Sequence, residues 1–245
     1  MVEDSPNLGE KAISKVAELG IANQLDQAED ISVDIRTAPE KLIQGEVDSV
    51  AIIGKGLVMK QDLRMESLEV TTDQVAINPL RAVFGTIELT RPTTAVAQIV
   101  LTETDINRAF NSNYLQSKLK GLTMQIDGKP VTVDVRETVI NLPGDNKFVI
   151  TADFLLKEQQ AMKQLSATAI PQVQADGHRI SLEILSTEGQ GLEAELVVAI
   201  LEQLTALLDL RNFDIPGMSL QLHELDVQTG RIVIQAQTQI EQIPS

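Results

Sequence analysis

One pattern is written twice in this sequence. Residues 63–77 read LRMESLEVTTDQVAI, residues 220–234 read LQLHELDVQTGRIVI, and the two segments align without a gap. In both, apolar and polar residues alternate at period 2, which predicts a strand, a turn and a second strand with one buried face. A chain that repeats such a unit is strongly constrained towards a β-sheet fold.

The alternation slips by one residue at the same place in both copies. In the first copy, Leu63 and Met65 share one face of the strand, whereas Leu68 and Val70 need the other face. A β-bulge would restore the pattern, and bulges bend a strand and increase its twist. We therefore predict a bulge in each copy and a sheet that curls. The repeated motif carries no catalytic group, which favours binding by shape.

The composition excludes several classes of function. The chain has 245 residues, of which 43% are apolar, but it has only five Phe, one Tyr and no Trp. Its interior must therefore be aliphatic, which is a poor surface for stacking sugars or bases. The formal net charge is −15 and no Lys/Arg cluster stands out, so nucleic-acid binding is not expected. An anionic membrane would repel the molecule on average, so any lipid contact should rest on apolar surface or on a local patch.

The first residues and the apolar segments bear on localisation. Residues 1–11 are acidic and polar and do not resemble a signal peptide, and no apolar stretch approaches the ~20 residues of a membrane-spanning helix. We therefore expect a cytoplasmic protein, with peripheral membrane contact left open. The chain has no Cys, which excludes disulfides and Cys–metal sites, and we expect no cofactor.

Three segments are predicted to be helical, at residues 6–28, 102–121 and 191–210. The third is the most apolar, with a stripe wide enough to be buried on most sides. The remaining segments alternate and are joined by hairpin turns, which favours antiparallel pairing. We predict an α+β fold in which a strongly curved antiparallel sheet, a partial barrel, wraps around long apolar helices. The whole chain, 1–245, is expected to form one elongated domain with two related halves.

Catalytic patterns are scarce in the sequence. His178 and His223 are expected in a turn and on the polar face of a strand, where solvated surface is the simplest interpretation. Residues 189–194 fit GxGxxA, but a dinucleotide site also needs a parallel βαβ unit, which the neighbouring segments do not supply. The carboxylates are scattered without metal-ligand spacing. We therefore predict that the protein is not an enzyme.

Candidate binding residues come from the apolar faces of the second and third predicted helices. They are Ile106, Phe110, Leu119, Leu196, Ile200, Leu204 and Leu208. For the stripe of the third helix, an ordinary core is the first interpretation and a ligand wall is the second. The loop 211–218 gathers Phe213, Ile215 and Met218 around a Pro-Gly turn, which favours either a membrane-contacting tip or a plug folded into the protein. Asn111 and Asn113 are more simply read as structural amides than as headgroup ligands.

Three stretches of the chain resemble the LmeA-like phospholipid-binding family of bacterial proteins. They are LTETDINRAFNSNYLQSKL at 101–119, the segment 44–70 that leads into the first motif copy, and DIPGMSLQLHELDVQTGRIVIQAQTQI at 214–240. The resemblance implies a curved antiparallel β-structure around long helices, related to tubular lipid-binding folds. It also implies binding of a phospholipid or phosphoinositide without an enzymatic step. Exported members of the family carry an N-terminal signal or anchor segment, which the first residues here do not resemble.

Two hypotheses follow for function. In the first, the protein binds or transfers phospholipid or another fatty-acyl ligand, held between the helix at 191–210 and the concave sheet face. Burial of ten or more CH₂ groups at ~0.8 kcal/mol each would compensate for weak headgroup contacts. In the second, the core is closed and the protein is a scaffold that acts through a protein partner at a membrane or envelope.

Overall fold

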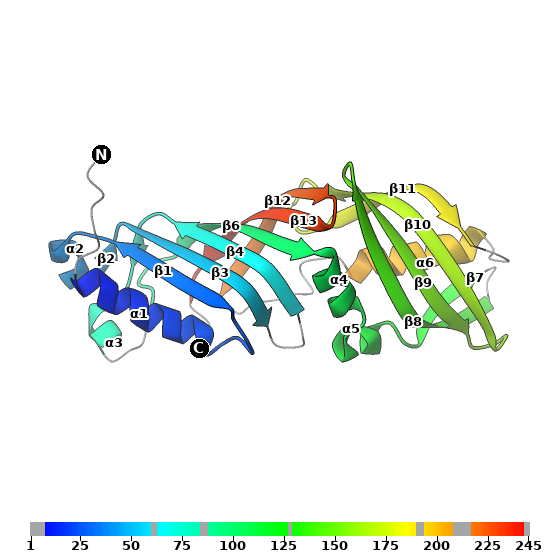
Figure 1. The fold of residues 1–245 in the computed structure, drawn as a ribbon, viewed down its shortest axis with the longest axis horizontal. Helices are drawn as coiled ribbons and strands as arrows, with labels where there is room; N and C mark the ends of the chain where they lie inside the picture. The colour runs from blue at the N-terminus through cyan, green and yellow to red at the C-terminus, as the bar shows by residue number, and fades with distance from the viewer. Residues whose placement is uncertain are drawn as a thin grey trace.

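Two antiparallel sheets lie along an elongated molecule and meet near its middle (Figure 1). The computed structural model describes residues 8–59, 63–83, 88–126, 129–189, 194–207 and 217–242. A six-stranded sheet forms one part of the molecule and a five-stranded sheet forms the other. A pair of two-residue strands, β2 (Glu46–Val47) and β5 (Val75–Ala76), forms a third, minor sheet.

The six-stranded sheet combines strands from distant parts of the chain. In the order in which they pair, they are β1 (Asp30–Arg36), β3 (Ser49–Met59), β4 (Leu63–Thr72), β6 (Thr93–Thr102), β13 (Arg231–Ile240) and β12 (Met218–Gln228). β6 and β13 pair over their full lengths, from Thr93 opposite Ile240 to Thr102 opposite Arg231. Both copies of the repeated motif therefore contribute a strand to this one sheet.

The five-stranded sheet is a consecutive meander. Its strands are β7 (Leu122–Ile126), β8 (Lys129–Gly144), β9 (Lys147–Leu156), β10 (Ala161–Val173) and β11 (Ile180–Glu188), paired in that order. Strong alternation explains the strands, since every second residue of β9 is buried and those between are half-buried. Register shifts in β8 and β10 bend the sheet, and the predicted curvature is present.

Helices cover one face of each sheet and the region between them (Figure 1). They are α1 (Leu8–Ala22), α2 (Pro39–Ile43), α3 (Pro79–Val83), α4 (Glu103–Phe110), α5 (Asn113–Lys118) and α6 (Ala194–Leu207). α1 packs on β1, where Ile13 and Ala17 meet the buried Val33 and Ile35. α6 packs on the five-stranded sheet, and α4 and α5 lie where the two sheets meet.

The prediction of long apolar helices was wrong. The segment predicted as one helix at 102–121 forms two helices of 8 and 6 residues. The break follows from Ser112, whose extended backbone and side chain cap α5 by accepting a hydrogen bond from Leu115 N. In the described part of α6, Ala194–Leu207, Val198 is 54% exposed, so that side of the helix is not covered.

The predicted bulges were half correct. In β12, the register with β13 shifts between Leu222 and Glu224, and the second motif copy is the predicted hairpin. In the first copy, β4 pairs with β3 in an unbroken register from Val50 opposite Thr72 to Met59 opposite Leu63. The change in alternation needs no bulge in β4. Its residues before Ser67 pair only with β3 and are mostly half-buried, so neither face of this part of the strand has to be fully apolar. The second strand predicted within this copy is β5, which pairs with β2 and not with β4, so the first copy does not form the predicted hairpin.

Candidate functional site

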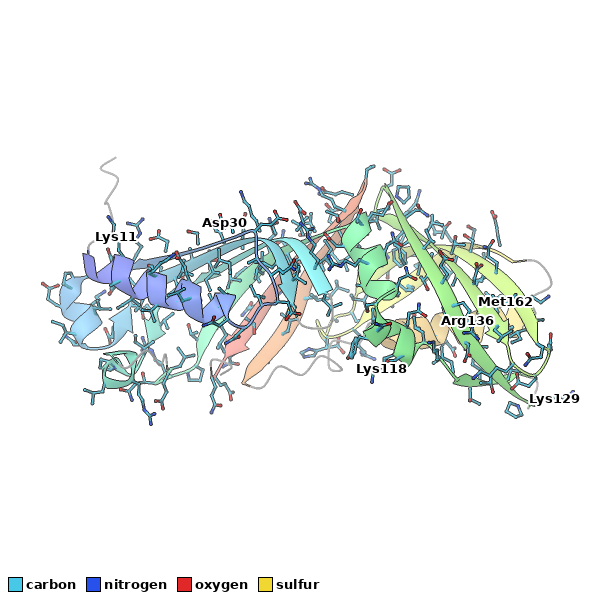
Figure 2. The ribbon with its side chains drawn as sticks, turned by 60° about the horizontal axis from the view of Figure 1, so that its bottom comes forward. Lys11, Asp30, Lys118, Lys129, Arg136 and Met162 are labelled. Atoms are coloured by element: carbon cyan, nitrogen blue, oxygen red, sulfur yellow. The ribbon has the colours of Figure 1, made fainter. Side chains whose placement is uncertain are left out.

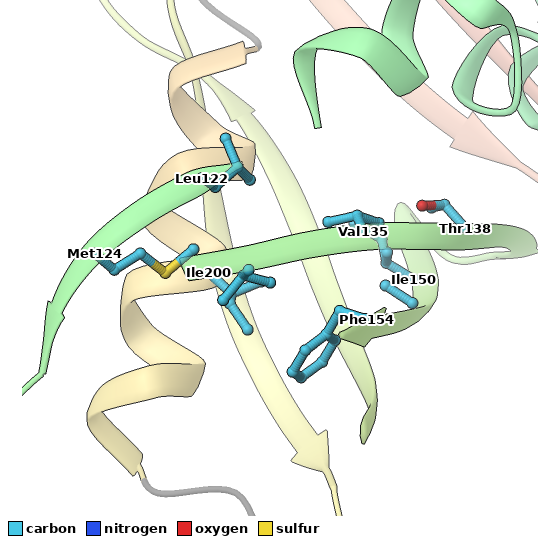
Figure 3. Close-up of a pocket in the computed structure, with 9 residues that line it drawn as sticks. Leu122, Met124, Val135, Thr138, Ile150, Phe154 and Ile200 are labelled. Carbon is cyan, nitrogen blue, oxygen red and sulfur yellow. The ribbon is translucent and has the colours of Figure 1, made fainter. Parts of the chain in front are cut away.

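An apolar cavity lies between α6 and the inner face of the five-stranded sheet (Figure 3). Its volume is about 10 Å³. Eight of its nine lining residues are apolar and the ninth is a threonine: Leu122, Met124, Val133, Val135, Thr138, Ile150, Ala152, Phe154 and Ile200. Such a cavity holds about one water-sized sphere, so the helix and the sheet are in close contact in this state.

The local sequence explains why these side chains converge. On β9, Ile150, Ala152 and Phe154 are spaced by two and face the same side. On β8, the register shift between Val135 and Glu137 changes the parity of the strand. As a result Thr138, rather than residue 137, continues the inner row after Val133 and Val135.

α6 closes the cavity with one face. Leu196 and Ile200 are 6% and 3% exposed and belong to one cluster with Met124, Val133 and Phe154. The two residues are one helical turn apart and therefore share a face. Val198 lies on the other side of the helix and is exposed. The sequence prediction that Leu196 and Ile200 face the sheet is thus consistent with their positions, whereas their role in binding lipid stays a prediction.

The other predicted lipid-binding residues are distributed more widely. Leu119 is fully buried beside Val135 and Ala152, next to the cavity, and Phe110 contacts that cluster too. Ile106 belongs to a separate cluster, where α4 meets the other end of β8. Leu204 lies on α6, but its side chain is outside the described part of the structure.

The predicted loop falls largely on residues that are not described. Leu208, Phe213 and Ile215 lie outside the described residues. The backbone of Met218 begins β12 opposite Ile240, and its side chain is likewise not described. The membrane-contacting tip therefore stays a prediction.

Sequence reasoning missed most of the cavity wall. Met124, Val133 and Phe154 belong to strands that the alternation predicted, whereas Thr138 lies between two of the predicted strands. The alternation separates two faces of each strand but does not say which face meets a helix. The position of Thr138 also depends on a bulge that no turn residue marks.

Thr138 is the one polar residue among the described residues of the cavity wall, and its hydroxyl is without a partner. The Thr138 side chain is 1% exposed, and its hydroxyl has no hydrogen-bond partner. Its backbone, in contrast, is held firmly, because Asn111 Oδ1 accepts from Thr138 N at 3.3 Å and Asn111 Nδ2 donates to Thr138 O at 2.8 Å. A buried hydroxyl without a partner costs free energy, so this position is not explained by packing alone.

α4 protects the edge of β8 that no strand covers. β7 pairs with β8 only up to Val133, which leaves the later part of that edge open. Asn107 spans both backbone groups of Ile140, with Oδ1 accepting from Ile140 N and Nδ2 donating to Ile140 O, each at 2.7 Å. Asn111 does the same for Thr138, and Glu103 Oε2 accepts from Leu142 N at 2.7 Å. The three side chains recur every four residues and so form one stripe along α4.

An ion-pair network fixes α4 to the six-stranded sheet. Arg64 on β4 contacts three carboxylates: Asp105 at 2.8 Å, Glu66 at 2.9 Å and Glu29 at 3.0 Å. Burial raises the pKa of Asp105, but hydrogen bonds from Thr102 and Arg64 outweigh burial, and the pKa lies below its ordinary value of 3.8. The same carboxylates raise the pKa of Arg64, which stays charged.

The remaining polar groups do not form a catalytic arrangement. Among the described residues, no group of three or more His, Cys, Asp or Glu side chains is placed to hold a metal ion. His178 Nδ1 lies 3.0 Å from Leu220 O, and His223 Nε2 lies 3.1 Å from Gln237 Oε1. Lys118, Lys129 and Arg136 lie on the outer surface, away from the cavity (Figure 2).

A second hollow lies on the polar face of the six-stranded sheet, over β6, β12 and β13. Its volume is about 360 Å³, and Glu224, Asp226 and Arg231 are among the residues that line it. The hollow is open to solvent and mostly polar, so it suits neither an acyl chain nor any site that must exclude water.

The fold and the cavity together define a β-rich protein with an apolar site, in which none of the described lining residues is charged. The chain belongs to the LmeA-like phospholipid-binding family, whose model matches residues 6–237. This match confirms the resemblance, and the description of the family names phospholipid binding. A comparison with curated proteins gives no match. Within the described residues, no helix is both long enough and apolar enough to cross a membrane.

Proposed function

We propose that this protein binds phospholipid non-enzymatically, with an acyl chain inserted between α6 and the inner face of the five-stranded sheet. The aliphatic cavity lined from both elements carries this proposal. Membership of the phospholipid-binding family supports the ligand class. Flexible hydrocarbon suits such a wall, because aliphatic side chains offer area without the geometric demands of ring stacking.

Binding requires α6 to move away from the sheet. A cavity of about 10 Å³ is far too small for a chain of ten or more CH₂ groups. Each CH₂ group removed from water contributes ~0.8 kcal/mol, so a long chain can offset the loss of contacts between α6 and the sheet. The protein would then present the ligand to, or take it from, a membrane by peripheral contact, and transfer between membranes is the activity that such a carrier supports.

The closed cavity also favours a second candidate. A core as tightly packed as this one suits a scaffold that acts through a protein partner and holds no lipid. The two candidates differ in whether the space between α6 and the sheet ever opens.

Two tryptophan substitutions on α6 test the first candidate. Ile200→Trp fills the space against the sheet, whereas Val198→Trp places the same ring on the exposed side of the same helix. After incubation with phosphatidylcholine vesicles, native mass spectrometry should show bound phospholipid on the wild type and on V198W. I200W should carry none while remaining folded by circular dichroism.

A wild-type protein that takes up no phospholipid from these vesicles would overturn the carrier proposal and favour the scaffold. Equal uptake by I200W and V198W would show that lipid binds elsewhere. Overpacking of a closed core costs ~1–3 kcal/mol, so the thermal stability of I200W is measured in parallel.

A further inference from the structure

The buried hydroxyl of Thr138 has no counterpart elsewhere in the cavity wall. Thr138 is 1% exposed and its hydroxyl has no hydrogen-bond partner. The eight other lining residues of the cavity are apolar. Because the backbone of Thr138 is held by Asn111, the hydroxyl cannot reach solvent by a small shift of the strand. A valine would fill nearly the same volume without leaving a donor unsatisfied.

A water molecule is a poor partner for this hydroxyl. Buried waters usually make two to four hydrogen bonds, whereas the cavity wall offers a single polar side chain. The better partner is a molecule that brings one hydrogen-bond acceptor attached to a hydrocarbon body.

We propose that the hydroxyl of Thr138 donates a hydrogen bond to an ester carbonyl of a bound acyl lipid. This inference rests on the proposed function, and it assigns the chemical group of the ligand that the cavity recognises. An ester carbonyl is a neutral acceptor at the head of an apolar chain, so it matches one donor in an apolar wall.

The charge of the site selects the ester over a free fatty acid. Among the described residues, no Lys, Arg or His lines the cavity, so a carboxylate inserted as far as Thr138 would be buried without a counter-charge from them. Burial of an unpaired carboxylate is far more costly than burial of an ester. A free acid would have to bind protonated, at a cost in affinity at neutral pH.

The position of Thr138 also orients the ligand. Thr138 and Met124 lie at opposite ends of the row of lining side chains (Figure 3). The ester end therefore lies on the side where α4 and Asn111 hold β8, and the hydrocarbon tail runs across α6 towards β7. The headgroup would emerge near the junction of the two sheets.

The experiment compares ester and ether forms of one lipid on the wild type and on Thr138→Val. Dioleoyl phosphatidylcholine and its dialkyl ether analogue, which lacks the carbonyls, are titrated against a bound fluorescent acyl probe. The wild type should prefer the ester, and T138V should lose roughly three- to tenfold in ester affinity with unchanged ether affinity. Thr138→Ser, which keeps the hydroxyl, should retain the preference for the ester.

The control is Thr123→Val on the neighbouring strand β7, where the side chain is exposed, and it should behave like the wild type. T138V should unfold at the same temperature as the wild type or higher, because it removes an unpaired buried hydroxyl.

Each outcome separates the inference from the function on which it rests. If the wild type binds neither lipid, the proposed function fails. If it binds both and T138V keeps the ester preference, only the role of Thr138 fails. Tighter binding of oleic acid than of the ester would overturn the assignment of the neutral carbonyl.

Discussion

At the scale of single residues, the sequence predicted a helix cap but not an ion pair between residues far apart in the chain. The predicted helix at 102–121 begins with Thr-Glu-Thr-Asp, a sequence that places Asp105 three residues after a Thr cap and indicates a capping box. In the structure Thr102 and Asp105 form that capping box. The same carboxylate meets Arg64 from β4, a contact between segments far apart in the chain. Nothing in the sequence around Arg64 indicates this partner, because ion pairs across elements follow from the topology.

The Asp105 carboxylate should make stability depend on acid. Its pKa is lower in the folded protein than its ordinary value of 3.8, so its contribution is complete above that value and is lost as the pH falls through the folded pKa. Asp105→Asn should lower the free energy of unfolding by about 1–3 kcal/mol at neutral pH, since Arg64 retains Glu66 and Glu29.

Urea denaturation of the wild type and D105N at several pH values checks this prediction. The difference between the two proteins should shrink as the pH is lowered below about 4. A difference that stays constant with pH would assign the effect to packing rather than to the ionised carboxylate.

At the scale of elements, alternation predicted the strands well but not the ends of the helices. Alternating residues on either side of turn sequences predict one hairpin at 122–135 and another at 139–156. In the structure the two merge into a meander, and β8 is one continuous strand with two register shifts against β9. The helix predicted at 102–121 breaks because Ser112 caps a new helix, although the apolar spacing continues through it. The spacing of apolar residues indicates which side of a helix is buried. It does not indicate that a capping residue such as Ser112 divides the segment into two helices.

Asn107, in the stripe of side chains along α4, should contribute more to the stability of the fold than its exposure suggests. Asn107→Ala removes the hydrogen bond to Glu103 O and both hydrogen bonds to the backbone of Ile140. We therefore expect a loss of about 1–3 kcal/mol in the free energy of unfolding. Asn113→Ala in α5 is the matched control, because Asn113 is exposed, and it should stay within about 0.5 kcal/mol of the wild type.

Chemical denaturation measures both variants, and hydrogen exchange of the β8 amides locates the effect. Faster exchange at Ile140 in N107A is the expected local signature. Equal stability of N107A and N113A would show that solvent satisfies this strand edge as well as the amide does.

At the scale of the whole molecule, curvature and antiparallel pairing were predictable, but the assembly of the sheets was not. The repeated motif indicated a curled sheet, and the family match supports the class of ligand. The sequence did not indicate that β4 and β12 would lie in the same sheet, separated by β6 and β13. Strand order depends on which apolar faces fit together across the fold. The alternation of apolar and polar residues in a strand does not indicate which other strand it pairs with.

The net charge of −15 should govern how the protein approaches membranes. Uptake of phospholipid from anionic vesicles should be slow at low salt and faster at high salt, because added ions screen the repulsion. Uptake from zwitterionic vesicles should change little. Stopped-flow measurements with a fluorescent phospholipid in both kinds of vesicle test this, and faster uptake from anionic vesicles at low salt would contradict it.

The full-length pairing of β6 with β13 has a consequence for the order of folding. The five-stranded sheet is encoded entirely between these two strands, so it can form while β12 and β13 have not yet been synthesised. During that interval one edge of β6 has no partner, and an unpaired edge is a template for aggregation. A ribosome that pauses between β11 and β12 would therefore hold a nascent chain with one finished sheet and one open sheet.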